Sequence, residues 1–399
     1  MNRILSIKNI NQARQELAKI KVSSQGIEVM APKCLGMSIK LTDVHIGAAN
    51  ILKQEMLSIG GDAAVTRGVV NGVEKTSDVI LLGNADKIKK LIKKLNHQTI
   101  FGLTEIREDL KRLISIPLQI TFRQFTIGSS IMDFSQPLIM GILNVTPDSF
   151  SDGNKFLSVD KAVHHALQMV EDGADIIDIG GESTRPEAKK VNIQEELDRV
   201  IPVIEMIRKN SNIPISIDTY KSEVAERAIS VGANIINDVS ALRFDKKIIE
   251  LLKKNENVPI ILMHMLGTPQ TMQTEPYYDD VIEEILTFFE ERLEYCRSNG
   301  IELDRIIIDP GIGFGKRQQD NLQILNKLSE FKCFGVPVLL GASRKSFIGR
   351  IYDSNSEDRL AGSMAATALA CEAGLQIVRV HDVKEQRRFL EVLKSVRKL

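Results

Sequence analysis

The chain has 399 residues, of which 43% are hydrophobic and 26% charged, and its 52 Lys and Arg residues balance 52 Asp and Glu residues. Length and composition are those of a soluble globular protein with about two or three domains. The balanced charge and the wide separation of the four cysteines argue against a nucleic-acid-binding protein and against a zinc site, and sparse cysteine fits a reducing compartment.

The N-terminal stretch MNRILSIKNINQARQEL carries charges throughout and has no small-residue cleavage site. It is therefore not expected to be a signal peptide, and no apolar run in the sequence is long enough to span a bilayer. We expect a cytoplasmic protein with no membrane partner.

A small α/β domain is expected over residues 1–127. Residues 49–70 predict a helix, a Gly-Gly helix end and a strand, and residues 78–84 predict a second strand. In residues 86–95 apolar side chains repeat at helical spacing between lysines, which predicts a surface helix with a solvated lysine face. No motif assigns this domain a function, so a role in packing or oligomerisation is the default expectation.

A second domain is expected over residues 137–399, after a small and polar linker at 128–136. Here eight short apolar runs alternate with amphipathic segments of helical length, which indicates a parallel sheet buried on both faces. Eight such units in about 260 residues predict a (β/α)8 TIM barrel. A doubly wound open sheet is the alternative, but no G-x-G-x-x-G follows the first run. The runs lie at 138–143, 175–179, 214–217, 234–237, 259–263, 305–309, 337–341 and 376–380.

Polar or ionisable residues follow nearly every one of these runs, where a barrel enzyme builds its site. The stretch RIIIDPGIGFGK, residues 305–316, is one example. It is not a nucleotide P-loop, because only three residues separate Gly311 from Gly315 and Arg317 follows Lys316. One polar strand end is usually a helix cap, but eight together predict a single lined mouth.

Two chemical groups of side chains stand out at these ends. Asp218, Asn237 and Asp309 come from three different strands and could together read a planar heterocycle rich in N–H groups. Taken singly, such a residue is more often a helix cap or part of a buried network. A cationic group could neutralise a phosphate or pyrophosphate leaving group, and consists of Arg185, Lys345, Arg379 and His381.

The alternative for the cationic group is ion pairing with Asp178, Glu182 and Asp382. Arg379 should nevertheless point into the barrel, because its neighbours Val378 and Val380 would face the helices. A magnesium ion shared with substrate phosphates needs only one or two protein oxygens, and Asn144 is the candidate ligand. His164 and His165 lie in the expected first helix and are expected to be structural.

The residues after 137 strongly resemble dihydropteroate synthase. The matching strings occur in the order of that family and cover all eight strand ends: GILNVTPDSFSDG, GADIIDIGGESTRP, ISIDT, IIND, LMHM, DPGIGFGK, GASRKSFIG and RVHDV. The resemblance implies a transferase that joins 6-hydroxymethyl-7,8-dihydropterin pyrophosphate to para-aminobenzoate. It yields 7,8-dihydropteroate and pyrophosphate on the route to folate.

The resemblance also implies roles for individual residues. Asp218, Asn237, Asp309 and Lys345 match the pterin pocket, with Met263 against the ring. Asn144, Arg379 and His381 match the pyrophosphate site, with Mg2+ at Asn144. Phe314 and Ser346 match the aminobenzoate site, and two loops contribute Phe150 in the first and Thr184, Arg185 and Pro186 in the second. The implied catalytic set is Asn144, Arg185, Asp309, Lys345, Arg379 and His381, acting by a dissociative, SN1-like mechanism in a homodimer.

The chain departs from the family pattern in two places. Glu187 stands where the second loop usually has glycine, and the N-terminal region is found only in longer members. Two other functions compete with the synthase: a pterin-dependent methyltransferase, and a non-catalytic pterin-binding or regulatory barrel. The intact cationic group disfavours both. A second folate activity in the N-terminal region is disfavoured because that region lacks clustered His, Cys or phosphate-loop residues.

Overall fold

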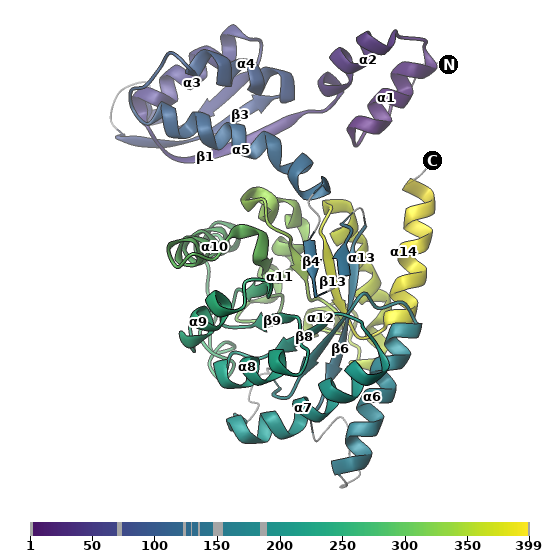
Figure 1. Ribbon diagram of the computed structural model, residues 1–399. Helices are drawn as coiled ribbons and strands as arrows, with labels where there is room; N and C mark the ends of the chain where they lie inside the picture. Colours follow the sequence, from purple (N-terminus) through teal and green to yellow (C-terminus); the bar gives the residue numbers. More distant parts are fainter. Residues whose placement is uncertain are drawn as a thin grey trace. The chain divides into compact units, whose positions relative to one another are not determined.

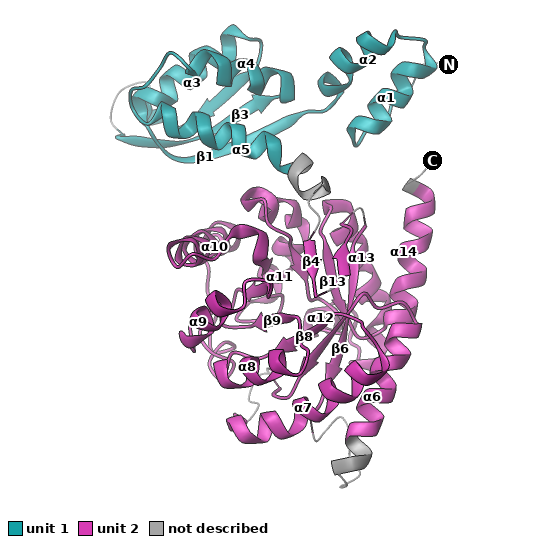
Figure 2. Ribbon diagram, viewed as in Figure 1, with its two compact units in different colours: residues 1–117 teal, residues 118–399 magenta. Residues whose placement is uncertain are grey.

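The computed structural model describes residues 3–69, 74–122, 125–128, 130–134, 136–146, 155–183 and 190–397. The chain forms two compact units, Met1–Pro117 and Leu118–Leu399 (Figure 2). None of the helices in the described ranges combines the length and the hydropathy that a bilayer crossing needs.

The first unit is an α/β unit whose described residues form a three-stranded antiparallel sheet in the order β1-β3-β2 (Figure 1). One face of the sheet packs against helices, and the buried core includes Leu41, Leu52, Leu81 and Leu91. The elements are α1 (Ile10–Lys19), α2 (Ser24–Met30), η1 (Ala31–Cys34), β1 (Met37–His45), α3 (Ile46–Ser58), β2 (Asp62–Val65), η2 (Arg67–Val69), β3 (Thr76–Gly83), α4 (Ala85–Leu95) and α5 (Leu103–Phe122), which runs past the unit boundary.

The predicted elements of this unit are present. The lysine-rich helix is α4, which buries Ile88, Leu91, Ile92 and Leu95 and begins where the Asn84 side chain accepts a hydrogen bond from the Lys87 amide. Four further elements, α1, α2, β1 and α5, were not predicted from the sequence.

The second unit is a TIM barrel, so the fold predicted from the apolar runs is confirmed. Within the described residues, eight parallel strands follow the order β11-β10-β9-β8-β7-β6-β13-β12, and a parallel bridge between Ile308 and Val338 joins the two ends of that order. The strands are β6 (Leu138–Asn144), β7 (Ile176–Gly180), β8 (Ile215–Asp218), β9 (Ile235–Asp238), β10 (Ile260–Met263), β11 (Ile306–Asp309), β12 (Leu339–Leu340) and β13 (Ile377–Val380).

Helices surround this sheet and bury its outer face (Figure 1). Ile177 and Ile179 of β7, for example, belong to the core between strands and helices. The helices are α6 (Lys155–Glu171), α7 (Ile193–Asn210), α8 (Ser222–Ser230), α9 (Lys247–Lys254), α10 (Val281–Ser298), α11 (Gln318–Asn326), α12 (Ser346–Tyr352), α13 (Leu360–Ala373) and α14 (Val383–Arg397), with the 3-10 segments η4 (Leu303–Arg305), η5 (Leu328–Phe334) and η6 (Glu357–Arg359).

A hairpin closes the amino end of the barrel. β4 (Phe125–Ile127) pairs antiparallel with β5 (Ser130–Met132), and the Phe125 and Phe134 rings lie 5.8 Å apart. This hairpin packs against the first inward-facing side chains of the strands, and we call the whole cluster the floor: Phe125, Ile127, Met132, Phe134, Leu138, Met140, Ile176, Ile235, Ile261, Ile307, Leu339 and Ile377. Part of the segment predicted as a linker, 128–136, therefore belongs to this cluster. The predicted domain limits themselves stay a prediction.

Candidate functional site

The carboxyl ends of the barrel strands form a mouth, as expected for parallel strands of one barrel. Asn144 ends β6, Asp218 ends β8, Met263 ends β10 and Asp309 ends β11, while Asn237 lies in β9 and Arg379 in β13. Phe314 follows β11, Lys345 and Ser346 begin α12, and His381 follows β13. Phe150, Thr184, Arg185, Pro186 and Glu187 lie outside the described residues.

Arg379 lies inside the barrel between two carboxylates. Its Nε donates to Oδ2 of Asp178 at 2.6 Å, and one terminal nitrogen donates to Oδ2 of Asp218 at 2.9 Å. Asn237 Nδ2 donates to the same Asp178 oxygen at 3.2 Å. The ion pair with Asp178 that the sequence offered as an alternative is thus formed, and it lies within the mouth itself.

Asp178 is a site residue that the sequence suggested only as a possible ion-pair partner of the cationic group. It is fully buried, and it lies two residues after Ile176, whose side chain belongs to the floor. Because side chains of a strand alternate between its faces, Asp178 shares the inward face with Ile176. The second acid of the run DIIDI, which lies among isoleucines, was the available signal.

Burial changes the charge balance of these groups. Removal from water and the neighbouring Asp178 carboxylate raise the pKa of Asp218 above its ordinary value, although the Arg379 guanidinium acts in the opposite direction. Burial disfavours the charged form of Arg379, but Asp178 and Asp218 outweigh it and raise the pKa of Arg379. The Arg379 guanidinium is therefore the shared ion-pair partner of the Asp178 and Asp218 carboxylates.

Lys345 is held mainly by neutral groups. Its Nζ donates to the Ile312 carbonyl and lies 4.6 Å from the centroid of the Phe314 ring. Burial lowers the pKa of Lys345 to about 8, against the opposing charge of Asp309. The buried Asp309 accepts a hydrogen bond from the Gly311 amide at 2.8 Å. Burial raises the pKa of Asp309, although Lys345 acts to lower it.

The glycine loop after β11 turns tightly over Asp309. Gly311, Gly313 and Gly315 all have positive φ, at 69°, 82° and 64°. A Cβ on Gly311 would lie 2.0 Å from the His264 carbonyl oxygen, so this position accepts only glycine.

His381 is held beside the loop between β12 and α12. Its backbone amide donates to Ser343 Oγ at 3.2 Å, and its Nδ1 lies 3.0 Å from the same oxygen. Next to them, Arg344 Nε donates to Asp382 Oδ2 at 3.0 Å. These contacts join the segments that carry Lys345 and His381.

The residues around Asn144 fit a magnesium ion held mainly by substrate. Asn144 is half-buried at the end of β6, and its Oδ1 lies 3.9 Å from where a Cβ on Gly180 would be. The missing side chain at Gly180 leaves this amide oxygen accessible from β7. Among the described residues, no group of three His, Cys, Asp or Glu side chains is placed to hold a metal ion. One hard oxygen donor suits Mg2+, which keeps water and substrate phosphates as its other ligands.

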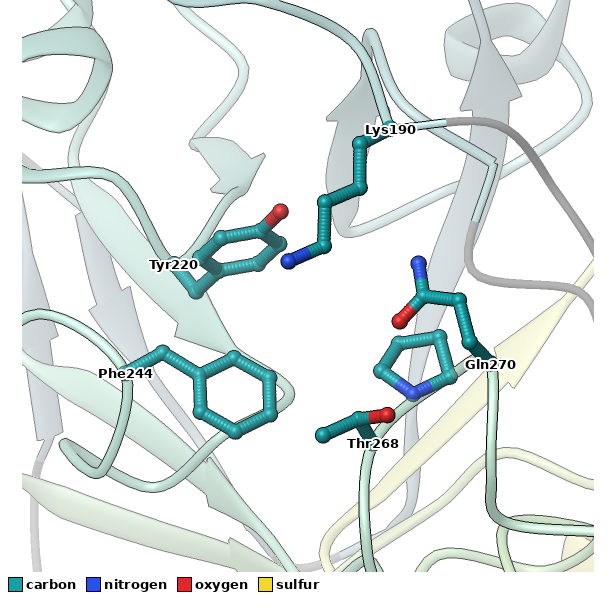
Figure 3. Close-up of a pocket in the computed structure, with 6 residues that line it drawn as sticks. Lys190, Tyr220, Phe244, Thr268 and Gln270 are labelled. Atoms are coloured by element: carbon teal, nitrogen blue, oxygen red, sulfur yellow. The ribbon is translucent and has the colours of Figure 1, made fainter.

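A small cavity of about 90 Å³ opens beside this mouth (Figure 3). The rings of Tyr220 and Phe244 meet edge to face at 5.4 Å in its wall, and Lys190 extends toward Tyr220. Thr268, Pro269 and Gln270 complete the lining. None of these residues was predicted from the sequence to belong to the site.

Comparisons with known proteins agree on one family. Residues 140–381 match the family model described as pterin binding enzyme. Dihydropteroate synthase of Escherichia coli is 46% identical over 271 residues, which cover 68% of this chain and 95% of that protein. A crystal structure of the Xanthomonas albilineans synthase with 4-aminobenzoic acid superimposes with a TM-score of 0.65 at 44% identity, covering 69% of this chain and all of that one.

A longer relative also matches the N-terminal unit. The probable bifunctional folylpolyglutamate synthase/dihydropteroate synthase of Halobacterium salinarum is 36% identical over 391 residues. That match covers 98% of this chain and 46% of the relative.

Proposed function

Because the chain belongs to the dihydropteroate synthase family, a family of transferases in folate biosynthesis, we propose that it condenses 6-hydroxymethyl-7,8-dihydropterin pyrophosphate with para-aminobenzoate to give 7,8-dihydropteroate and pyrophosphate. The observation that carries this proposal is the convergence of acceptor and cationic side chains from six strand ends on one mouth. They are Asn144, Asp218, Asn237, Asp309, Lys345 and Arg379.

The pterin would occupy the inner part of the mouth. Asp309 and Asn237 are buried and offer a carboxylate and an amide to the N–H groups of a planar ring. Met263 belongs to a small apolar cluster with Val239, Met265 and Met272, which supplies a surface for the face of the ring. Asp218 and Lys345 would complete the pocket.

The pyrophosphate would lie where β6 and β13 end. Asn144, Arg379 and His381 would bind it there, together with Thr184, Arg185 and Pro186 of the second loop. Mg2+ bound at Asn144 would neutralise charge that develops on the leaving pyrophosphate. Arg379 contributes a second positive charge from inside the barrel, and the hydrogen bond with Ser343 fixes the position of His381.

Para-aminobenzoate would enter in front of the pterin. Phe314 packs against the same apolar cluster as Met263 and would face its ring, with Ser346 and Phe150 as further contacts. The bond between the pterin methylene and pyrophosphate breaks first, and the arylamine attacks the resulting cation. A neutral arylamine is already nucleophilic, so no strong general base is needed.

We also propose that the protein is a cytoplasmic homodimer with a separate N-terminal domain, for which the sequence predicts residues 1–127, a linker at 128–136 and a catalytic domain from residue 137. Because Phe125, Ile127, Met132 and Phe134 pack in the floor, the hairpin belongs with the catalytic domain. The described N-terminal sheet and helices offer no candidate site. The Halobacterium relative matches the N-terminal unit as well as the barrel, whereas the Escherichia coli synthase matches only 68% of this chain. The N-terminal unit would therefore be an accessory of the longer family members.

The decisive experiment is product formation from purified protein, dihydropterin pyrophosphate, labelled para-aminobenzoate and Mg2+. We expect labelled dihydropteroate, and loss of product when Mg2+ is removed. Binding of the pterin substrate without any product would instead identify a non-catalytic pterin-binding protein. In that case Glu187→Gly, which restores the usual residue of the second loop, becomes the first variant to assay.

A further inference from the structure

A buried lysine stands beside the mouth without being part of the proposed catalytic set. Lys316 is only 2% exposed, although a buried ammonium group is costly unless hydrogen-bonded. Three acceptors surround its Nζ: His264 Nδ1 at 2.9 Å, the Phe314 carbonyl at 3.1 Å and the His264 carbonyl at 3.4 Å. An ammonium group has three protons to donate, so this environment matches it in number.

The pair formed by Lys316 and His264 lies behind the substrate pocket. Met263 ends β10 and faces the mouth, so His264 faces the other way. Its ring meets the Phe288 ring of α10 edge to face, at 4.8 Å between centroids. Neither Lys316 nor His264 is therefore positioned to touch the substrates, and any effect on catalysis must pass through other residues.

Lys316 is one of several side chains that fix the glycine loop. The Ile312 carbonyl accepts from Lys345, the Gly313 carbonyl from Gln273 at 3.0 Å, the Phe314 carbonyl from Lys316, and the Gly315 carbonyl from the Tyr278 hydroxyl at 2.8 Å. Four consecutive carbonyls are thus held by side chains from different segments. Because the left-handed glycines give this loop no regular backbone ladder, these donors set its shape.

The backbone of Asp309 is held independently of Lys316, although burial raises the pKa of the Asp309 carboxyl and the charge of Lys316 acts to lower it. Asp309 pairs with Met263 across the β10–β11 ladder, and its carbonyl accepts from the His264 amide at 2.9 Å. Loss of the Lys316 side chain therefore leaves Asp309 in its strand, while the Phe314 carbonyl loses its hydrogen bond and the Phe314 amide keeps only its bond to the Gly311 carbonyl at 3.1 Å.

We propose that Lys316, held by His264, is a positioning residue. It fixes the position of the Phe314 ring against the aromatic amine substrate and has little influence on binding of the pterin substrate. The proposal rests on the proposed synthase function. Lys316 would then contribute to substrate specificity from outside the pocket, because the position of the Phe314 ring depends on the hydrogen bond that Lys316 donates to the Phe314 carbonyl.

The test uses the full chain and the variant Lys316→Met, which keeps most of the side-chain volume and removes the hydrogen bonds. We expect the KM for para-aminobenzoate to rise about tenfold, as for the loss of one buried hydrogen bond. The Kd of dihydropterin pyrophosphate, measured without the amine, should change less than the KM for the amine, because the Asp309 backbone and its hydrogen bond from the Gly311 amide stay in place.

Lys332→Met is the matched control. Lys332 is also largely buried and donates to a backbone carbonyl, that of Ala373 at 3.1 Å, but it lies in η5 before β12, at the amino end of the barrel. Its loss should leave both the KM and the Kd unchanged. A Lys316→Met variant that weakens both substrates equally, or that lowers thermal stability with no change in KM, would overturn the proposal.

A second pair of variants covers the case in which Lys316→Met does not fold. His264→Gln retains an acceptor for Lys316, whereas His264→Leu removes it. The KM for the amine should rise in His264→Leu and be largely restored in His264→Gln, and equal behaviour of the two would overturn the proposal. Wild-type protein assayed in parallel separates the two ideas, because failure of the proposed function would leave the wild type itself inactive.

Discussion

The floor and the mouth of the barrel are lined by successive inward-facing residues of the same strands. In β11, Ile307 belongs to the floor and Asp309 to the mouth; in β13 the corresponding residues are Ile377 and Arg379. Ile235 and Asn237 of β9, and Ile176 and Asp178 of β7, follow the same rule. Each of these four strands therefore changes from apolar packing to polar chemistry within two residues.

The two ends of the barrel are stabilised by different interactions. The floor is held by aliphatic and aromatic packing, which is non-directional and tolerates changes of similar volume. In the mouth, charges and hydrogen bonds compensate one another at fixed distances, and removal of one partner leaves another buried and unpaired. Changes at the two ends should therefore fail in different ways.

The largest effect is expected from truncation into the floor. Removal of residues 1–117 leaves the hairpin intact, whereas removal of residues 1–127 also deletes Phe125 and Ile127. Loss of two such buried side chains costs about 5 kcal/mol or more. We expect the shorter truncation to give a soluble, folded barrel and the longer one to melt far lower or precipitate. Equal melting temperatures would show that the hairpin does not hold the floor.

Arg379→Met should have the next largest effect, because it leaves Asp178 and Asp218 without their shared cation. Removal of one partner from a buried ion pair costs about 3–5 kcal/mol. We expect a lower free energy of unfolding in urea, together with loss of turnover. Addition of Asp218→Asn should recover part of the stability but none of the activity. If the double variant is no more stable than the single one, the pairing described above is not what holds Arg379.

Gly311→Ala tests the backbone of the mouth without changing a charge. A left-handed conformation costs a non-glycine residue about 1–3 kcal/mol. Here the new Cβ would also meet the His264 carbonyl oxygen at 2.0 Å. Gly313→Ala is the matched control, since its Cβ would have only Lys345 Cδ nearby, at 3.4 Å. We expect a clearly lower melting temperature for the first variant than for the second.

The smallest effect concerns pH. Lys345 has a pKa of about 8 in the folded chain, so its charge is present below that pH and is lost above it. The Kd for dihydropterin pyrophosphate should therefore rise by up to about tenfold per pH unit above this point, and Lys345→Met should abolish this dependence. Titration calorimetry between neutral and alkaline pH would measure it. A wild-type curve that stays flat would contradict the assigned pKa.

The contribution of Lys345 to the free energy of unfolding should change in the opposite direction to ligand binding as the pH rises. The pKa of Lys345 falls from 10.5 to about 8 on folding, so the unfolded chain binds more protons between these values. The contribution of Lys345 to stability therefore increases as the pH rises through that window.

Much of this structure follows from local sequence patterns. The eight apolar runs predict the strands, and the residues after them predict the mouth, because parallel strands of one barrel end on the same side. The β4–β5 hairpin was missed because its polar turn and following proline dominate a segment only a few residues long. Its burial depends on contacts with strands that come much later in the chain.

Asp178 and Lys316 were missed for a related reason. The sequence offers Asp178 as one of three possible ion-pair partners of the cationic group, but it does not show that Arg379, some two hundred residues later, is the cation that pairs with it inside the mouth. Likewise, nothing near Lys316 indicates that His264 provides an acceptor for it. Contacts between distant strand ends are a property of the closed barrel, so local patterns identify the participants without pairing them.

The hairpin at the floor also affects the order in which two ligands can enter the barrel. Because apolar side chains of the described strands and hairpin fill the amino end, molecules exchange with bulk water only through the mouth. In a pocket with a single opening, the ligand that binds deepest must enter first. Asp309 and Asn237 are buried whereas Phe314 is partly exposed, so in the proposed arrangement the pterin would enter before the aromatic amine, and an amine that bound first would block its path.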